Sequence, residues 1–382
     1  MIEKLIYKIQ QARRRASKKL RVLNVVELNG LALRNNFEYF KKLHPESRIC
    51  PVLKSNAYGH GINEIAQICD GLNAPYLVVD SYYEALELKK IGIKTPLLII
   101  GYTHPDNYKN MKFSGIAITV LDKETIEALG NLRKKITIHL KVDTGMHRQG
   151  IPVNELEEAL VLIKKYKKLN LEGICTHLAD ADNLKSDVFT KKQVGVFKKA
   201  LLVAKKYGFE IKWRHVSATA GAGKIFGSEF NMIRMGLGLY GDSPFKDYKK
   251  LKPVLTFKST IIDIKNLKKG ECVSYGCTFK ATKDMKIGIV PAGYYEGIDR
   301  ELSNKGVIYH GKTACKIVGR VCMNLTMIDL SKAKNAKKWD SVEVIGADSA
   351  RENSAREIAE MCGTITYVIW THIAPTIRRK IV

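Results

Sequence analysis

The chain has 382 residues, 45% of them hydrophobic, and a formal net charge of +26. This length allows two globular domains, each with its own apolar core. The charge suggests a nucleic-acid or membrane partner. However, the lysines are scattered along predicted helix faces and loops, and no helix-turn-helix, zinc-finger or single-strand-binding signature accompanies them. We therefore expect no nucleic acid and no membrane among the partners.

The chain has eight cysteines, and none forms a Cys-x-x-Cys pair. Several lie in apolar runs, which predicts reduced core cysteines and no metal site. No signal peptide or spanning segment is visible, because apolar runs such as 97–100 are far too short. We expect a cytoplasmic protein.

Residues 1–22 read as a basic helical extension. Ile2, Leu5, Ile6 and Ile9 follow helical spacing, and a cluster of arginines and lysines comes after them. Because the apolar stripe is short, packing on the protein body is favoured over membrane contact.

From residue 23 to 245, short β-branched runs alternate with longer amphipathic stretches, which is typical of parallel βα units. Eight such runs predict a (β/α)₈ barrel, with the active site at the carboxyl ends of its strands. The runs are 49–53, 76–80, 97–101, 117–121, 136–142, 171–176, 211–216 and 232–236. An earlier run, 25–28, is left over, and we expect it to pair with the second domain.

Residues 246–382 change to successive strands joined by turns, which predicts a mainly β domain. The expected strands are 254–264, 286–290, 306–309, 314–318, 325–329 and 341–345, followed by a helix over 354–362.

Lys54 ends the first predicted strand of the barrel and opens into a polar, glycine-containing loop. A lysine held against apolar surroundings loses solvation of its charged form, so its pKa falls and a nucleophilic amine becomes available. Such an amine reacts with aldehydes, of which pyridoxal phosphate is the usual one in enzymes. The alternative is a surface lysine that extends its ammonium group into water.

Other polar side chains follow later strands of the barrel. Arg148 comes after the fifth strand, where it can face a cofactor or a substrate carboxylate, or close its loop on Asp143. His177 follows the sixth strand and His215 belongs to the seventh. A single histidine at a strand end is usually structural, but several polar groups at successive strand ends of one barrel indicate an active site.

The segment Lys-Ser-Asn-Ala-Tyr-Gly-His-Gly at 54–61 resembles the cofactor-lysine signature of the bacterial alanine racemases. Residues 141–150 are similar to the second signature of that family, and the resemblance continues from about residue 25 to the C-terminus. It implies a pyridoxal-phosphate-dependent isomerase that interconverts L- and D-alanine, supplying D-alanine for peptidoglycan.

The resemblance also implies roles for individual residues. Lys54 would hold the cofactor and serve as one catalytic base, and Tyr275 would be the other. Arg234 would bond the pyridine nitrogen, supported by His215, while His177 packs against the ring and contacts the tyrosine. An arginine at that nitrogen leaves it unprotonated, which favours racemisation over decarboxylation. The remaining expected contacts are Tyr58, Thr219, Gly236 and Leu237 for the phosphate, Arg148 for the cofactor and substrate, Met323 for the substrate, and Lys141, often carbamylated in the family, for orienting Arg148.

The sequence departs from the family pattern at several positions. Thr219 supplies a hydroxyl where the best-known members have an Asn-Ser pair, and Pro375 stands where many have a phosphate-binding tyrosine. Asn324 replaces the usual aspartate, and Tyr295 and Glu296 make a bulkier variant of an entrance segment. A serine or broad-specificity racemase on the same scaffold is therefore the alternative.

The family pairs the two bases across a homodimer, so that Tyr275 would enter the partner's barrel. Two rivals remain. A barrel-type pyridoxal-phosphate decarboxylase requires an acidic partner at the pyridine nitrogen. A non-enzymatic pyridoxal-phosphate carrier lacks a second β domain.

Overall fold

The computed structural model describes residues 21–225, 228–245 and 250–382. The predicted N-terminal helix lies outside these residues except for its last two positions. The chain divides into two compact units. The barrel unit consists of Leu28–Leu255 with Ile381–Val382, and the β-rich unit consists of Thr256–Lys380 with the described residues before Leu28.

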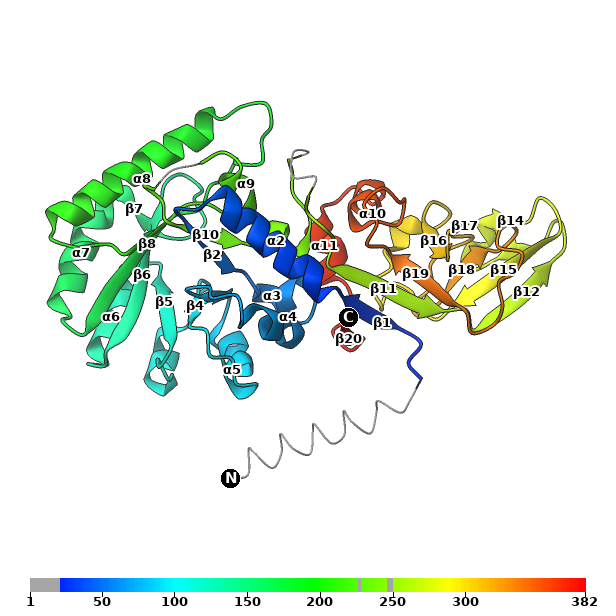
Figure 1. Cartoon of the computed structure of the whole chain (residues 1–382), viewed down its shortest axis with the longest axis horizontal. Helices are drawn as coiled ribbons and strands as arrows, with labels where there is room; N and C mark the ends of the chain where they lie inside the picture. Colours follow the sequence, from blue (N-terminus) through cyan, green and yellow to red (C-terminus); the bar gives the residue numbers. More distant parts are fainter. Residues whose placement is uncertain (1–20, 226–227, 246–249) are drawn as a thin grey trace, which may run out of the picture. The chain divides into compact units, whose positions relative to one another are not determined.

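Eight parallel strands form a ring in the barrel unit, as predicted. Most of them are labelled in Figure 1. They are β2 (Arg48–Pro51), β3 (Leu77–Val79), β4 (Leu97–Ile99), β5 (Ile116–Val120), β6 (Ile136–Asp143), β8 (Leu169–Cys175), β9 (Trp213–His215) and β10 (Met232–Met235). A ladder runs from β3 to β9, and β10 pairs with β2. A parallel bridge between Val52 and Val78 joins β2 to β3. The backbone N–H of Arg234 closes the ring by donating to the Ser217 carbonyl at 3.0 Å.

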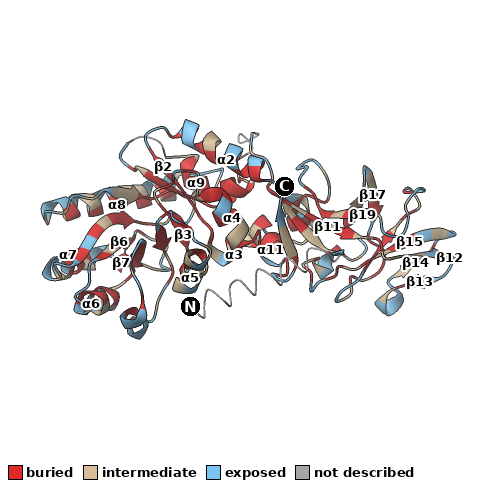
Figure 2. Ribbon diagram, turned by 60° about the horizontal axis from the view of Figure 1, so that its bottom comes forward, coloured by how far each residue is buried: buried red, intermediate tan, exposed pale blue. Residues whose placement is uncertain are grey.

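Helices surround this ring, with buried faces turned inward and exposed faces outward (Figure 2). They are α2 (Gly30–Leu43), α3 (Lys54–Tyr58), α4 (Ile62–Cys69), α5 (Tyr82–Lys90), α6 (Lys123–Asn131), α7 (Leu156–Lys165), α8 (Val188–Lys206) and α9 (Thr219–Ala222). Short segments complete the unit: η1 (Pro105–Asn110), β7 (Ile151–Pro152), η2 (Val153–Glu155) and η3 (Leu237–Tyr240). Ser81 and Asp122 cap α5 and α6 by accepting hydrogen bonds from first-turn N–H groups. These caps start the helices directly after the strands.

The β-rich unit contains two main sheets and one hairpin. One sheet has the order β17-β16-β19-β11-β1-β20, so the leftover run β1 (Val25–Leu28) pairs here, as predicted. The other has the order β12-β15-β18, and β13 pairs with β14. Their bounds are β11 (Leu255–Thr260), β12 (Asp263–Leu267), β13 (Cys272–Val273), β14 (Phe279–Lys280), β15 (Met285–Val290), β16 (Val307–His310), β17 (Thr313–Lys316), β18 (Thr326–Asp329), β19 (Ser341–Ile345) and β20 (Arg378–Ile381), with η4 (Tyr275–Cys277), η5 (Arg300–Leu302), α10 (Ala355–Met361) and α11 (Thr366–Thr371).

The single strand predicted over 254–264 is wrong. The chain forms β11 and β12, which belong to different sheets. At the break, the N–H of Ile261 donates to Asp340 and that of Ile262 donates to Ile289, so consecutive residues bond to different sheets. Both residues are β-branched and no glycine or proline marks the bend, which explains why the pattern suggested one strand.

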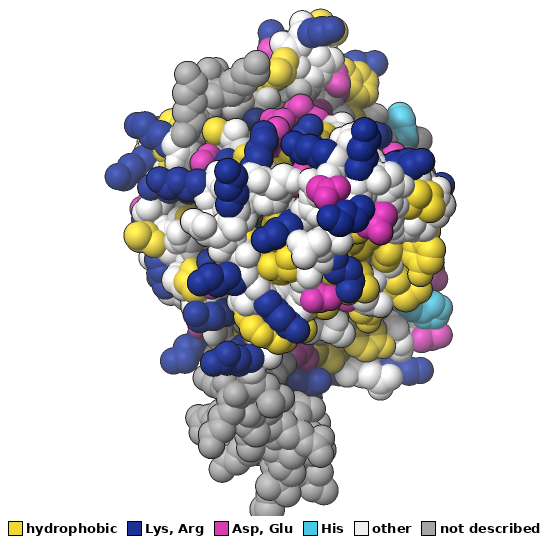
Figure 3. Space-filling view, turned by 90° about the vertical axis from the view of Figure 1, so that its right-hand side faces the viewer, with side chains coloured by type: hydrophobic (Ala, Val, Ile, Leu, Met, Phe, Trp, Pro, Cys, Tyr) yellow, Lys and Arg dark blue, Asp and Glu magenta, His cyan; other side chains and the backbone are white. Residues whose placement is uncertain are grey.

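The surface charge is dispersed. On the face drawn in Figure 3, Lys and Arg side chains lie among neutral and acidic ones instead of forming one continuous patch. None of the described helices is long and apolar enough to span a membrane. All eight cysteines are free thiols, and four of them are buried.

Candidate active site

Lys54 lies just beyond the carboxyl end of β2, at the start of an unusual turn. The next four residues, Ser55 to Tyr58, all have φ between 52° and 55° although none is glycine. This is a left-handed helical turn, which costs L-residues about 1–2 kcal/mol each. Strain of this kind concentrates at functional sites, where the surrounding structure enforces it. Here the turn carries Lys54 out of the strand and returns the chain to α4.

Glu84, in the first turn of α5, holds this turn in place. One carboxylate oxygen accepts hydrogen bonds from the N–H groups of Ser55 at 2.6 Å and Asn56 at 3.4 Å. The other accepts from the N–H of Asp80 at 2.8 Å. The Lys54 ammonium lies 3.7 Å from the Asp80 carboxylate, and its side chain is 36% exposed. The lysine therefore stands beside a carboxylate, not in the wholly apolar setting that the sequence suggested.

Arg234, on β10, is buried at the same end of the barrel. Nη1 donates to His215 Nδ1 at 2.7 Å and to the His215 carbonyl at 3.0 Å. Nη2 donates to the carbonyls of Thr176 at 2.8 Å and Val216 at 3.3 Å, and contacts His177 Nδ1 at 3.2 Å. Within the part of the chain that the structure describes, Nε makes no hydrogen bond. The guanidinium is thus held through Nη1 and Nη2, and its Nε–H group is an unused donor.

His177 is buried beside Arg234 and feels the positive charges of the site. Burial lowers its pKa to about 3, with further lowering by Arg234, Arg148, Lys141 and Lys54. The imidazole is therefore neutral at physiological pH. Because Nδ1 accepts from Arg234, the ring proton resides on Nε2, which is available as a donor.

Lys141 and Arg148 lie on and after β6. The Lys141 ammonium donates to Gln149 Oε1 at 3.1 Å. Burial lowers the pKa of Lys141, and Arg234 and Arg148 lower it further. Asp143 closes the following loop by accepting from the N–H groups of residues 145–147. Loop closure therefore does not need Arg148, whose side chain is exposed.

A small cradle lies between α3, α9 and η3. A Cβ placed on Gly236 would be 2.7 Å from the Tyr58 hydroxyl, so only glycine lets the backbone approach this group. The Thr219 hydroxyl accepts from the N–H of Gly238 at 3.0 Å. Leu237 begins η3 directly after the glycine. Hydroxyl and backbone N–H groups at a barrel mouth are the groups that bind phosphate.

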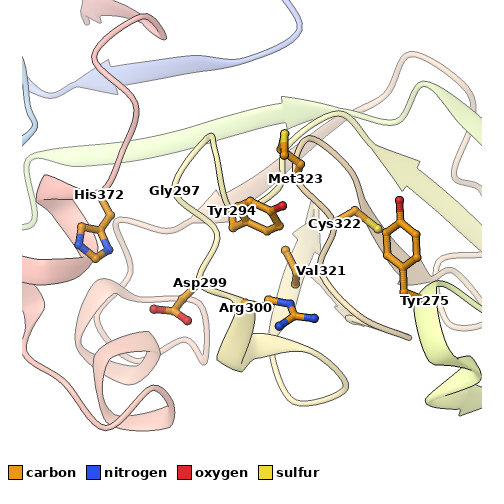
Figure 4. A pocket seen from close by; sticks show the side chains of 9 residues that line it. All are labelled: Tyr275, Tyr294, Gly297, Asp299, Arg300, Val321, Cys322, Met323 and His372. Carbon is orange, nitrogen blue, oxygen red and sulfur yellow. The ribbon is translucent and has the colours of Figure 1, made fainter.

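Tyr275 and Met323 belong to the β-rich unit, where they line one pocket of about 770 Å³ (Figure 4). Tyr275 is 69% exposed and Met323 is 56% exposed. The lining residues are Tyr275, Tyr294, Gly297, Asp299, Arg300, Val321, Cys322, Met323 and His372. Residues 274, 276 and 277 around the tyrosine have positive φ, so it projects from a tight turn.

Two residues of this unit that depart from the family pattern, Asn324 and Glu296, form a hydrogen bond with each other. Asn324 Nδ2 donates to Glu296 Oε1 at 2.8 Å, and Glu296 Oε2 accepts from the N–H of Gly293 at 2.8 Å. Glu296 is buried. An aspartate at position 324 would oppose a second carboxylate here, so the asparagine and the glutamate form a matched pair.

Comparison with known proteins identifies the family. Residues 28–244 match the model of the alanine racemase N-terminal domain, and residues 254–381 match that of the C-terminal domain. The chain belongs to the alanine racemase family. This family consists of pyridoxal-phosphate-dependent racemases.

Individual family members are similar over nearly their whole length. The alanine racemase of Carboxydothermus hydrogenoformans is 34% identical over 361 residues, covering 92% of this chain and 98% of its own. Alanine racemase 1 of Oceanobacillus iheyensis is 36% identical over 352 residues, covering 90% and 93%. A solved alanine racemase of Clostridium difficile 630 is 31% identical with a TM-score of 0.88, covering 95% of this chain and 97% of its own.

The structure thus gathers most of the predicted site residues on the barrel unit of this alanine racemase family member, at or beyond the carboxyl ends of its strands. These are Lys54, Tyr58, Lys141, Arg148, His177, His215, Thr219, Arg234, Gly236 and Leu237. Tyr275 and Met323 meet around the separate pocket of the β-rich unit.

Sequence reasoning missed three residues near the site: Glu84, which holds the Lys54 turn, His139, whose Nδ1 lies 2.8 Å from His215 Nε2, and Glu172, which lies 3.6 Å from His139. His139 carried a usable signal, because Thr137, His139 and Lys141 alternate along one strand and so share a face. Glu84 had no such signal, because its partners are backbone N–H groups of a distant turn.

Proposed function

We propose that this protein is a cytoplasmic alanine racemase, which interconverts L- and D-alanine and so supplies D-alanine for peptidoglycan synthesis. The observation that carries the proposal is the placement of Lys54, Lys141, Arg148 and Arg234 at or just beyond the carboxyl ends of parallel barrel strands, with Arg234 Nη2 3.2 Å from His177 Nδ1. A dianionic, aldehyde-bearing cofactor and a substrate carboxylate match this positive site, which also provides an amine.

The residues present fit pyridoxal phosphate. Lys54 supplies the amine, Arg234 keeps one buried guanidinium N–H unused for a ring nitrogen, and the cradle at Gly236 and Tyr58 suits the phosphate. When bound, the cofactor withdraws electrons from the α-carbon of the attached amino acid and so acidifies its proton. A guanidinium at the ring nitrogen donates a hydrogen bond without transferring a proton, which limits this withdrawal and suits racemisation. A decarboxylase would require a carboxylate in that position.

Inverting an α-carbon needs one base on each face, and we assign these roles to Lys54 and Tyr275. In either direction, one group removes the α-proton from its own face, and the conjugate acid of the other group delivers a proton to the opposite face, so each group serves one enantiomer. His177, with its proton on Nε2, can donate a hydrogen bond to a tyrosinate and so favours its formation at neutral pH. The high exposure of Tyr275 in the single chain supports its placement in a partner's barrel, in a two-fold homodimer with shared sites. A non-enzymatic carrier would have no use for this second unit.

Substrate recognition follows from Arg148 and Met323. Arg148 can pair with the substrate carboxylate, and the backbone amide of Met323 can donate to it. Asn324 and Glu296 stiffen the segment beside Met323, and Tyr295 beside them is 57% exposed. These departures from the usual family residues favour, as a second candidate, a racemase that also accepts serine or larger amino acids.

The test is an assay of D-amino-acid formation from L-alanine, L-serine, L-lysine and L-arginine by the cofactor-loaded protein. Alanine should be racemised fastest, and Lys54→Ala and Tyr275→Phe should each abolish turnover. Lys123→Ala is the matched control, because the Lys123 ammonium pairs with the carboxylates of Glu155 and Glu158 on the outside of the barrel. Faster turnover of another amino acid would assign the substrate to the second candidate, and no racemisation of any of the four would refute the proposal.

A further inference from the structure

A buried chain of polar side chains extends from Arg234 into the barrel interior. His215 Nε2 lies 2.8 Å from His139 Nδ1, and both rings are completely buried. His139 Nε2 lies 3.6 Å from Glu172 Oε2. Four side chains on β10, β9, β6 and β8 thus form a line from the guanidinium to a carboxylate, in which the first two contacts are hydrogen bonds and the last, at 3.6 Å, is longer than a hydrogen bond.

The direction of every proton in this chain follows from Arg234. A guanidinium has only donors, so its contact at 2.7 Å requires His215 Nδ1 to be unprotonated. Burial and the charge of Arg234 hold the pKa of His215 well below its usual range, so the ring is neutral and carries its proton on Nε2. That N–H donates to His139 Nδ1, and His139, whose pKa burial also lowers, must carry its own proton on Nε2, facing Glu172.

Glu172 is held as an anion at the end of the chain. Its carboxylate contacts His139, accepts a hydrogen bond from the Tyr76 hydroxyl, and pairs with the Lys212 ammonium at 3.0 Å. These partners lower the pKa of Glu172 to about 2. A permanent acceptor therefore faces the Nε2–H group of His139.

We propose that His139 and Glu172 are positioning residues that fix the tautomer of His215 and thereby aim Arg234. That Arg234 is aimed at the pyridine nitrogen of the cofactor rests on the proposed function. The tautomer assignment rests on the contacts, burial and charges of these side chains and does not depend on the proposed function. Glu172 and Arg234 are thus opposite charges whose orientation is coupled through two neutral rings.

Glu172→Gln tests the coupling because it replaces a pure acceptor by a side chain that can also donate. The amide N–H of the introduced glutamine, facing His139, favours the tautomer with its proton on Nδ1. That proton points at His215 Nε2, so His215 Nε2 must become an acceptor. The His215 proton then resides on Nδ1, opposite the Arg234 N–H. Two donors then face each other, and Arg234 loses this contact while its carbonyl bonds to residues 176, 215 and 216 keep it in the barrel.

The experiment is ¹⁵N NMR of the holoenzyme labelled at histidine, which reports the protonation of each ring nitrogen. In the wild type, His139 and His215 should both show a protonated Nε2 and an unprotonated Nδ1. In Glu172→Gln, at least His215 should shift towards a protonated Nδ1, and kcat for racemisation should fall roughly tenfold, the scale for residues that orient a group in direct contact with the reacting centre.

Lys212→Ala is the matched control, because it removes a partner of Glu172 and leaves the chain of rings intact. It should leave both tautomers unchanged. A wild-type spectrum with a protonated Nδ1 on His139 or His215 would overturn the inference even if Glu172→Gln did not fold. Unchanged tautomers in a folded Glu172→Gln variant would do the same. If the predicted tautomers were found in a protein without racemase activity, the proposed function would fail and the positioning role would stand.

Discussion

Removing the Glu84 carboxylate should release the left-handed turn that presents Lys54. Glu84→Ala deletes two short hydrogen bonds to backbone N–H groups, at 2.6 and 2.8 Å, and a long one at 3.4 Å. Hydrogen bonds to a charged acceptor contribute about 1.5–3 kcal/mol each, and less where water competes, as it does at this half-buried site. The turn also stores the strain of four left-handed residues, which these hydrogen bonds help to offset. We expect the free energy of unfolding to fall by about 2–3 kcal/mol.

Urea unfolding and cofactor titration measure the two consequences. The loosened turn should also weaken pyridoxal-phosphate binding, because Lys54 must be oriented again each time the cofactor binds. Glu87→Ala is the matched control: Glu87 lies on the same helix and makes one hydrogen bond, at 3.5 Å, with Asn63. Glu84→Asp keeps the charge at the helix start but cannot reach the turn, so it should resemble the alanine variant. Equal stability of the Glu84→Ala and Glu87→Ala proteins, with equal cofactor affinity, would refute the reasoning.

Three further outcomes are expected. Gly236→Ala places a Cβ 2.7 Å from the Tyr58 hydroxyl, so the affinity for the cofactor should fall roughly tenfold. Gly195→Ala is the control: its Cβ would have no atom within 4 Å, and it should stabilise α8 by up to about 1 kcal/mol. Equal cofactor-titration curves for the two variants would contradict this prediction. His177 has a lowered folded pKa of about 3, so below pH 6.5 the unfolded chain binds the extra proton. Stability of the wild type, compared with His177→Asn, should therefore fall by about 1 kcal/mol per pH unit between pH 6 and 4, and parallel profiles would exclude a buried neutral ring. Asn324→Asp places a second carboxylate against that of Glu296, so the free energy of unfolding should fall by about 1–3 kcal/mol at pH 7 and by less in acid. An unchanged melting temperature at both pH values would show that the Asn324–Glu296 pair does not contribute to stability.

The barrel could be predicted from the sequence because its strands are short β-branched runs at regular intervals, and several of them are followed by a polar residue at the carboxyl end. Lys54, His177 and His215 were therefore placed at one end of the barrel by topology alone. The left-handed conformation of Ser55 to Tyr58 could not be predicted, since only glycine and asparagine signal positive φ locally and the turn depends on a carboxylate 29 residues from Ser55.

Other features escaped because they depend on long-range pairing. The break between β11 and β12 is decided by two sheets that compete for adjacent N–H groups at residues 261 and 262. The contact between His139 and His215 joins strands 76 residues apart. Periodicity can show that a side chain points into the barrel, but it cannot show which group it meets there.

Subunit complementation tests the central claim most directly, namely that Lys54 of one chain and Tyr275 of another act on one substrate. Lys54→Ala and Tyr275→Phe homodimers should each be nearly inactive. After mixing in equal amounts with full exchange, half the dimers are mixed, and one of the two sites in each has both bases, so activity should return to about one quarter of the wild-type value. No recovery despite demonstrated exchange, or full activity of a monomer at high dilution, would contradict the account.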